Sequence, residues 1–237
     1  MENYVDFHIH STFSDGKYSI EEITNFARKH NFRSIGITDH YKTTKVKSMD
    51  NKMLEKYIET IDSINSDIKI YKGIEIDFSS RTDFSMLDFS IFENLNFVLF
   101  EYVEDSSMGG YPLWRLLEIF DKIKIPIGLA HNNIMKNFHF IKIDDLISLF
   151  ESHSIFIELN TNKNYTILGE YYYTLSEEFF KLLKGRNVPI SVGSDMHNSL
   201  DEMLNVKNGL EFIELFNLND NLDLFLKKFK IIIKFFN

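Results

Sequence analysis

The strongest constraint on the fold is a regular alternation of short apolar runs with longer amphipathic segments. Seven runs have the length and β-branched or aromatic content of strands, at residues 4–8, 34–38, 70–76, 97–100, 125–130, 155–159 and 190–193. Strands that alternate with helices predict βα units joined into a parallel sheet. Seven units predict a closed barrel rather than an open, doubly wound sheet.

The segments between the strands show helical periodicity. We expect helices at residues 20–30, 53–64, 113–123, 143–151, 175–183 and 200–216. The first follows Ser19 and has Glu21 and Glu22 in its first turn, which suits a helix N-terminus. The sequence contains no GxGxxG, GxxxxGK[ST], GxSxG or HExxH motif. This excludes the common dinucleotide, P-loop, serine-hydrolase and zincin sites.

Each predicted strand ends in a polar or metal-ligand-type residue. His8 and His10 are two residues apart at the end of the first strand, so both imidazoles can face one ion. Asp195 and His197 repeat this spacing after the seventh strand. The strand ends between them supply His40, Glu75, Glu101, His131, and Asn160 with Thr161. In barrels of parallel strands this carboxyl-terminal face carries the active site.

The spacing of these residues supports the barrel. Positions 8, 40, 75, 101, 131, 160 and 195 follow one another at intervals close to one βα unit of about 30 residues. Five of the eight histidines fall at strand ends, which independent placement would rarely produce. The other three, His30, His139 and His153, lie in helix-end or loop context and are assigned no role.

Several residues near the strand ends have less certain roles. Asp15 is either a turn aspartate before Gly16 or a further metal ligand at the mouth of the barrel. We expect Asp39 to orient an imidazole, and we leave Asp77 undecided. Asn160 is expected to bind substrate by hydrogen bonding. The lysines in the loops at the active face are candidates for a phosphate contact: Lys42, Lys45, Lys47 and Lys163.

Composition limits the partners. The chain has no cysteine, so a metal must bind through imidazole and carboxylate groups. The net charge of −9 disfavours long nucleic acids, whereas bound cations would reverse the charge locally. We find no signal peptide and no apolar run of the roughly 18 residues that a membrane span needs. We therefore expect a cytoplasmic protein that forms one domain over residues 1–237.

Six segments closely resemble the polymerase and histidinol phosphatase (PHP) family. They read DFHIHSTFSDG, GITDH, GIEID, GLAHNN, ELNT and GSDMH, and span residues 6–197 in the family's order. The resemblance implies a distorted (β/α)7 TIM-like barrel that binds two to three divalent ions, usually zinc, manganese or iron. Residues 198–237 would then form a C-terminal helical segment packed on the barrel.

The resemblance also implies a role for each ligand. A first ion would be bound by His8, His10, Glu75 and Asp195, and Glu75 would bridge to a second ion that His131 also binds. A third ion would be bound by Asp15, His40 and His197.

One position departs from the family pattern. The family commonly has a histidine ligand for the second ion at the end of the fourth strand, where this chain reads NFVLFEYVED. Glu101 is the expected substitute, and Val103 is the other alignment, which cannot bind a metal.

These ligands predict a phosphoesterase. We expect metal-bound hydroxide to attack a small phosphomonoester, with Asp15, His40, Glu75 and His197 as the catalytic residues. The resemblance to the family suggests histidinol phosphate as one candidate. The alternatives are a nuclease or nucleotide phosphatase on the same cluster, and a degenerate binding module. The oligomeric state is left open.

The apolar and basic C-terminal segment, LDLFLKKFKIIIKFFN, also has two interpretations. We expect a final helix or strand that packs on the barrel. The alternative is a segment that binds a membrane surface or a partner.

Overall fold

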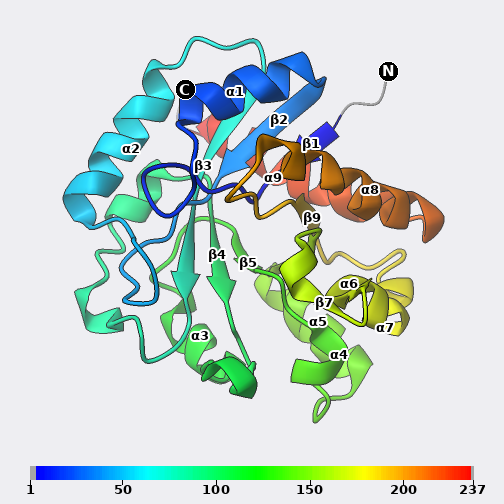
Figure 1. Cartoon of the computed structure of the whole chain (residues 1–237). Helices are drawn as coiled ribbons and strands as arrows, with labels where there is room; N and C mark the ends of the chain where they lie inside the picture. Colours follow the sequence, from blue (N-terminus) through cyan, green and yellow to red (C-terminus); the bar gives the residue numbers. More distant parts are fainter. Residues whose placement is uncertain (1–3, 236–237) are drawn as a thin grey trace.

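Seven parallel strands form one curved sheet in the computed structural model, which describes residues 4–235 and the side chains of residues 4–228 (Figure 1). Their order around the sheet follows the sequence: β1 (Tyr4–Asp6), β2 (Phe32–Ile37), β3 (Lys69–Asp77), β4 (Phe97–Glu101), β5 (Ile127–Leu129), β6 (Phe156–Asn160) and β9 (Ile190–Gly193). All neighbouring pairs are parallel. The helices between them provide the crossovers that parallel strands require.

The sheet curls until its two edges meet. The Phe7 amide donates to the Val192 carbonyl at 2.8 Å, and the Asp195 amide donates to the His8 carbonyl at 2.7 Å. Ile9 and Met196 add a parallel bridge just beyond the strand ends. The predicted barrel is therefore confirmed as a nearly closed ring of seven strands.

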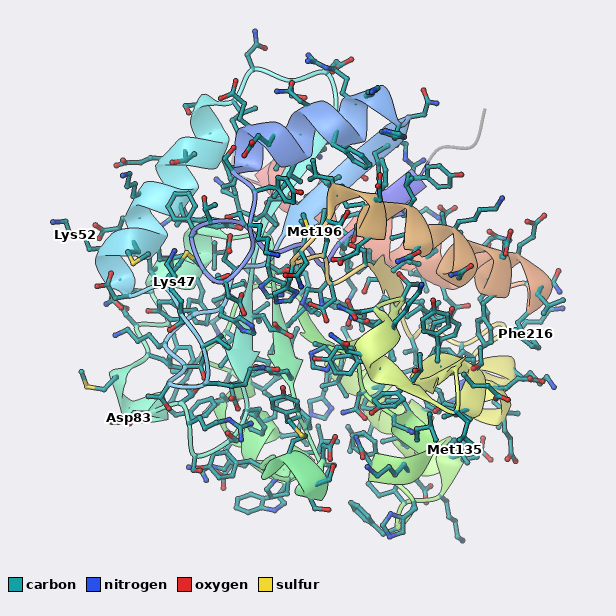
Figure 2. The ribbon with its side chains drawn as sticks, viewed as in Figure 1. Lys47, Lys52, Asp83, Met135, Met196 and Phe216 are labelled. Atoms are coloured by element: carbon teal, nitrogen blue, oxygen red, sulfur yellow. The ribbon has the colours of Figure 1, made fainter. Side chains whose placement is uncertain are left out.

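Helices cover the outside of the ring. They are α1 (Ile20–Lys29), α2 (Asn51–Ser63), α3 (Leu113–Phe120), α4 (Ile134–Asn137), α5 (Ile143–His153), α6 (Tyr172–Leu175), α7 (Glu177–Leu182), α8 (Val206–Leu215) and α9 (Asn219–Phe235). Ser19 begins α1 with a capping box to Glu22, as the sequence predicts. In Figure 2, Lys52, Asp83 and Phe216 lie toward the periphery, whereas Met196 lies near the centre of the molecule.

Two expected helices are interrupted. The segment 175–183 belongs to two short helices that meet at Ser176, a buried residue whose hydroxyl accepts from the Met135 amide at 3.3 Å. Serine has only a moderate helix propensity, so a break at this position costs little. The segment 200–216 begins as a 3-10 turn (Leu200–Asn205) before α8. A small antiparallel hairpin of β7 (Thr166–Ile167) and β8 (Glu170–Tyr171), which we did not predict, precedes α6.

Large aromatic side chains fill the barrel, and glycines on neighbouring strands make room for them. A Cβ at Gly73 would lie 2.6 Å from the Phe97 ring, and a Cβ at Gly128 would lie 2.1 Å from the Phe156 ring. Both distances are too short for carbon contacts, so these positions cannot carry a larger residue without movement of the ring. The interior is therefore a packed core, with no room for a channel.

Helix α9 closes the amino-terminal end of the barrel. The Phe225 ring lies 4.7 Å from Phe7 and 4.8 Å from Phe156, measured between ring centroids, and is fully buried. Phe156 is the first residue of its strand, so Phe225 contacts the end opposite the predicted ligands. The C-terminal segment thus packs on the barrel as a helix over the described side chains; residues 236 and 237 lie outside the described range.

In residues 4–235, none of the helices combines the length and apolar character that crossing a lipid bilayer requires.

Candidate metal centre

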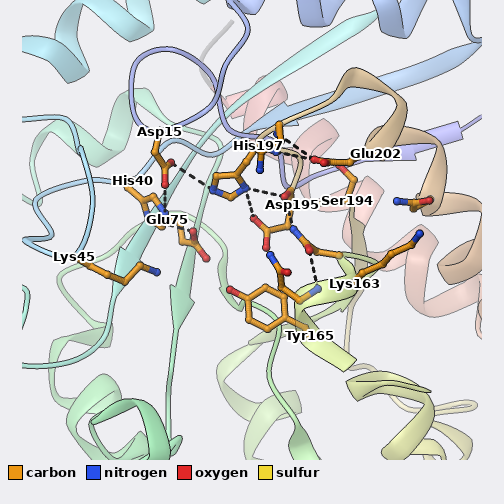
Figure 3. A pocket seen from close by; sticks show the side chains of 14 residues that line it. Asp15, His40, Lys45, Glu75, Lys163, Tyr165, Ser194, Asp195, His197 and Glu202 are labelled. Atoms are coloured by element: carbon orange, nitrogen blue, oxygen red, sulfur yellow. Dashed lines mark hydrogen bonds and ion pairs between the residues drawn. The ribbon is translucent and has the colours of Figure 1, made fainter. Parts of the chain in front are cut away.

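The nine ligands predicted from the sequence meet in one place, at the carboxyl ends of the strands. Seven of them are buried, and Asp15 and His197 are partly exposed toward a pocket (Figure 3). The nine are His8, His10, Asp15, His40, Glu75, Glu101, His131, Asp195 and His197. Seven of them form three overlapping groups whose nitrogen and oxygen atoms lie close enough to share an ion, and His131 and Asp195 contact these groups through Glu75 and His10.

The first group surrounds the two histidines that follow β1. His8 Nε2 and His10 Nε2 are 3.0 Å apart, and both are 3.4 Å from Glu75 Oε2. Asp195 Oδ1 lies 3.5 Å from His8 Nε2 and 3.2 Å from His10 Nε2. Two imidazole nitrogens that face each other between two carboxylates fit a tetrahedral site for an ion such as Zn²⁺.

The second group is built around Asp15. Its carboxylate oxygens lie 3.4 Å from His197 Nε2 and 3.8 Å from His40 Nε2. His10 Nδ1 is 3.6 Å from the same carboxylate, so His10 joins the three residues that the family pattern suggests. Asp15 therefore lies among candidate ligands, and its position is not that of a simple turn aspartate.

The third group lies between β3 and β4. His131 Nε2 is 2.9 Å from Glu75 Oε1 and 3.7 Å from Glu101 Oε2, and His40 Nδ1 is 3.8 Å from Glu101 Oε1. His40 Nδ1 is buried and has no hydrogen-bond partner, although it lies 3.3 Å from Glu75. A buried nitrogen left unpaired beside a carboxylate is a second observation that fits a cation in this centre.

Two ligands have unusual backbone conformations. His131 has a φ of 32° and Asp195 has a φ of 52°, in the left-handed region that residues other than glycine rarely adopt. Such strain is typical of residues held in place for function. In both cases the strained residue lies directly beyond the apolar end of a strand.

Glu158 contacts two of the candidate ligands and was not predicted from the sequence. It lies in the middle of β6 and is buried. Its Oε1 is 2.7 Å from His8 Nδ1, and its Oε2 accepts from the His131 amide at 2.7 Å. A carboxylate at Nδ1 fixes the imidazole so that Nε2 points at the ion. The sequence feature that could have indicated Glu158 is that it is the one acidic residue within the strand FIELN.

Asp39 does not orient an imidazole, contrary to our expectation. Its carboxylate accepts from the amides and hydroxyls of Ser11 and Ser14, at 2.5 to 2.9 Å. The Ser14 hydroxyl also lies 3.2 Å from Asp15 Oδ1. Asp39 therefore fixes the loop that presents Asp15, because four hydrogen bonds already use its oxygens.

Two of the three expected substrate-binding residues lie elsewhere. Lys42 donates to the Met86 carbonyl at 2.8 Å and is not among the residues that line the pocket. Asn160 is buried and donates to Glu158 at 3.2 Å, so it contacts a residue that holds His8 and does not face the pocket. Lys163 does line the pocket. The amide groups of Asn162 and Asn164, which we did not single out, line it as well.

Asp77 and the other two loop lysines have protein partners. Asp77 forms an ion pair with Arg81, at 2.5 and 3.1 Å, and is therefore not a metal ligand here. Lys47 donates to the Thr12 carbonyl at 2.6 Å. Lys45 reaches the centre itself and forms an ion pair with Glu101.

The electrostatics of the metal-free centre follow from burial and close charges. Burial lowers the pKa of His8, but Glu158, Glu75 and Asp195 oppose it, and the net pKa is well above the usual value. The pKa of His10 rises to about 10 for the same reason, through Asp195 and Glu75. Burial lowers the pKa of His40 to about 3, so its imidazole is neutral.

The centre opens into a pocket of about 600 Å³. Its walls combine Asp15, His40 and His197 with the 162–165 segment after β6 (Figure 3). Tyr165 stacks on the His131 ring at 3.8 Å with an interplanar angle of 3°. This size suits a small ligand, because pockets of about 300–1,000 Å³ are usual for such ligands.

Comparison with known proteins gives the same assignment. The PHP domain model matches residues 6–186. A DNA polymerase/3'-5' exonuclease PolX from Bacillus subtilis is 26% identical over 212 residues, which cover 84% of this chain and 35% of the relative. The chain thus spans about a third of the length of the curated relative it matches.

Two solved structures share the fold. A histidinol phosphate phosphatase from Lactococcus lactis, determined with zinc, L-histidinol and phosphate, gives a TM-score of 0.61 at 15% identity. The match covers 90% of this chain and 93% of that one. A putative histidinol phosphatase from Listeria monocytogenes gives 0.57 at 14% identity and covers 84% of this chain and 97% of that one. With the family model covering most of the barrel and the ligands in its order, this chain belongs to the PHP domain family.

Proposed function

We propose that this PHP-domain phosphoesterase hydrolyses a small phosphomonoester with the help of two or more divalent ions such as Zn²⁺, Mn²⁺ or Fe²⁺. The observation that carries the proposal is the buried group of imidazoles and carboxylates at the base of a pocket of about 600 Å³. Divalent ions in such a group activate water near neutral pH and neutralise charge on phosphoryl oxygens.

The chain's own residues divide the work. His8, His10, Glu75 and Asp195 would hold one ion, and Asp15, His40 and His197 would hold another. Asp15 and His197 are the two ligands with exposure to the pocket, at 24% and 22% of their side chains. They therefore lie where a substrate that enters the pocket would meet the bound ion.

The pocket favours a small substrate. Lys163 supplies an ammonium group on its rim, and the neighbouring asparagines supply neutral donors for phosphate or hydroxyl groups. The net charge of −9 opposes a long polyanion. The histidinol phosphate phosphatase with the same fold supports histidinol phosphate as one member of the test panel.

The test is a comparison of kcat/KM across substrates on metal-loaded protein. Histidinol phosphate and other small monoesters should be hydrolysed with higher kcat/KM than single-stranded oligonucleotides. Lys163→Met should raise KM for the best monoester by roughly 10–100-fold, as expected for a lost charge-assisted hydrogen bond. Lys52→Met, an exposed change on α2, is the matched control. An oligonucleotide preferred over every monoester would contradict the proposal.

One observation favours a second candidate, the release of nucleotides from a nucleic-acid end. A smaller pocket of about 220 Å³ adjoins the centre beside His131 and is lined by Tyr102, Tyr165 and Tyr172. Aromatic side chains of this kind can stack a base. The relative named as a 3'-5' exonuclease is consistent with such a use. Faster hydrolysis of a terminal nucleotide than of any free monoester would select this candidate, and Tyr172→Ala should then raise KM for the oligonucleotide alone.

A further inference from the structure

The loop after β2 carries a lysine whose ammonium group lies inside the metal centre. Lys45 Nζ donates to Glu101 Oε1 at 3.0 Å, to Glu101 Oε2 at 2.8 Å and to the Tyr102 hydroxyl at 2.8 Å. An ammonium group has three N–H donors, and these three acceptors use them all. Lys45 therefore has no donor left for a substrate phosphate, although it lines the pocket.

The surroundings of Glu101 require a positive charge. Glu101 is fully buried, and a buried carboxylate is costly unless it is paired. His40, Glu75 and Glu101 form one of the three groups with the spacing of a metal site, and His131 is 3.7 Å from Glu101 Oε2. Either a metal ion or the ammonium group could meet this requirement, and the ammonium group already bonds both oxygens of Glu101.

The lysine is anchored by the protein around it. Its amide donates to the Thr43 hydroxyl at 3.1 Å, and that hydroxyl donates to Asp77 at 3.3 Å. Asp77 is paired with Arg81, whose guanidinium lies 5.1 Å from the centroid of the Tyr102 ring. This network fixes both the loop and the tyrosine that receives the third hydrogen bond.

We propose that the Lys45 ammonium group replaces a metal ion beside Glu101, so that this centre binds two ions where the family pattern has up to three. Glu101 then serves as the partner of Lys45 and not as the substitute ligand that the sequence suggests. His131 keeps its contact with Glu75. The inference rests on the proposed metal-dependent function and defines how many ions that function uses.

The test is a count of bound ions. Metal-free protein is loaded with excess Zn²⁺ or Mn²⁺ at pH 8, desalted, and analysed for metal per chain, with folding checked by circular dichroism. The wild-type chain should retain two ions. Glu101→Gln should also retain two, because its carboxylate binds no ion. Lys45→Met should retain a third ion, and Lys45→Met/Glu101→Gln should return to two. Lys47→Met, in the same loop, is the control and should retain two.

The outcomes separate this inference from the function on which it rests. Three ions in the wild type, falling to two in Glu101→Gln, would overturn the inference and leave the phosphoesterase intact. A folded Lys45→Met variant that stays at two ions would also overturn it. A wild-type chain that retains no ion would overturn the proposed function itself and the inference with it.

Discussion

At the scale of single residues, the centre depends on groups that never touch the ion. Glu158 is the clearest case, because one carboxylate fixes the ring of His8 and the backbone of His131 together. Gly193 makes this possible, since a Cβ there would lie 2.1 Å from the Glu158 carboxylate. The identity of a glycine on β9 is thus tied to the orientation of His8, which follows β1.

Removing the charge of Glu158 should weaken metal binding without unfolding the chain. Glu158→Gln keeps the shape but loses the strong acceptor at His8 Nδ1, and loss of such a partner typically costs about 10–100-fold in metal affinity. Competition with a chromogenic chelator would measure it. Glu151 lies on the outer helix α5 and forms an ion pair with Arg186. Glu151→Gln breaks this pair and should leave the metal affinity unchanged. If Glu158→Gln and Glu151→Gln bind metal with equal affinity, Glu158 does not support the metal site.

The raised pKa values of His8 and His10 predict that metal binding releases protons. The carboxylates around His8 and His10 favour a protonated imidazole at this position, and a ligand nitrogen must be neutral. Because the pKa of His10 is higher in the folded than in the unfolded chain, its protonation stabilises the fold in the absence of metal. This stabilisation is complete below a pH of about 6.5 and is lost as the pH rises through about 10. Metal affinity should therefore increase with pH over the same window.

Calorimetric titration in two buffers with different ionisation enthalpies would count the protons. We expect release of at least one proton per chain at pH 7.5 as the first ion binds, because the facing Nε2 atoms of His8 and His10 hold a proton between them. His139→Ala, at an exposed position, should give the same count as the wild type. Heats that do not depend on the buffer would show that His8 and His10 are already neutral.

At the scale of elements, the ends of strands were easier to predict than anything between them. An apolar run followed by a histidine or an acid marks a strand end in this fold, and eight of the nine candidate ligands were located in this way, whereas Asp15 lies in the loop after the first strand. Glu158 escaped because it lies inside a strand, where the pattern predicts burial and gives no reason for a charge. The pairing of Lys45 with Glu101 escaped because it joins a loop to a strand 56 residues away.

The same limits apply to the helices. Cap residues such as Ser19 act within one turn, so the sequence predicts them well. At the break between α6 and α7, Ser176 bonds to the Met135 amide, a partner 41 residues away that local periodicity does not predict. The helical tail could be predicted to pack, but its place at the amino-terminal end of the barrel is known only from the rings that Phe225 contacts.

Helix α9 should contribute strongly to stability through that one ring. Phe225→Ala leaves a cavity against Phe7 and Phe156 and should lower the free energy of unfolding by about 3–5 kcal/mol. Urea denaturation followed by circular dichroism would measure the loss. Leu215→Ala, whose side chain is 71% exposed at the end of α8, is the control and should change little. A loss below that of the control would mean that α9 is not an integral part of the barrel.

At the scale of the whole molecule, closure of the barrel assembles the site. Asp15, His40 and His197 come from segments that follow the first, second and seventh strands, and only a ring brings these together. If the three share an ion, His40→Ala and His197→Ala should each lower kcat/KM strongly. Loss of a residue that only hydrogen-bonds to a metal ligand costs roughly 10–100-fold, so loss of a ligand itself should cost at least as much. The double variant should be little worse than either single one, because residues that act as a unit are not additive.

Metal content and kcat/KM of both single variants and the double variant would decide this prediction. Losses that multiply, with full metal retention, would mean that the three residues do not form a common site. Thermal unfolding of the same proteins separates a lost ion from a lost fold.

The central claim is that ions at the carboxyl ends of the strands make this barrel a phosphoesterase. The most direct measurement is a titration of metal-free protein with Zn²⁺ or Mn²⁺, in which bound ions and hydrolysis of a small phosphomonoester are followed in the same samples. We predict negligible hydrolysis before metal is added and a rise in rate that is complete when two ions are bound per chain. Hydrolysis that proceeds at full rate without bound metal, or full occupancy of two ions with no hydrolysis of any phosphoester, would contradict the account.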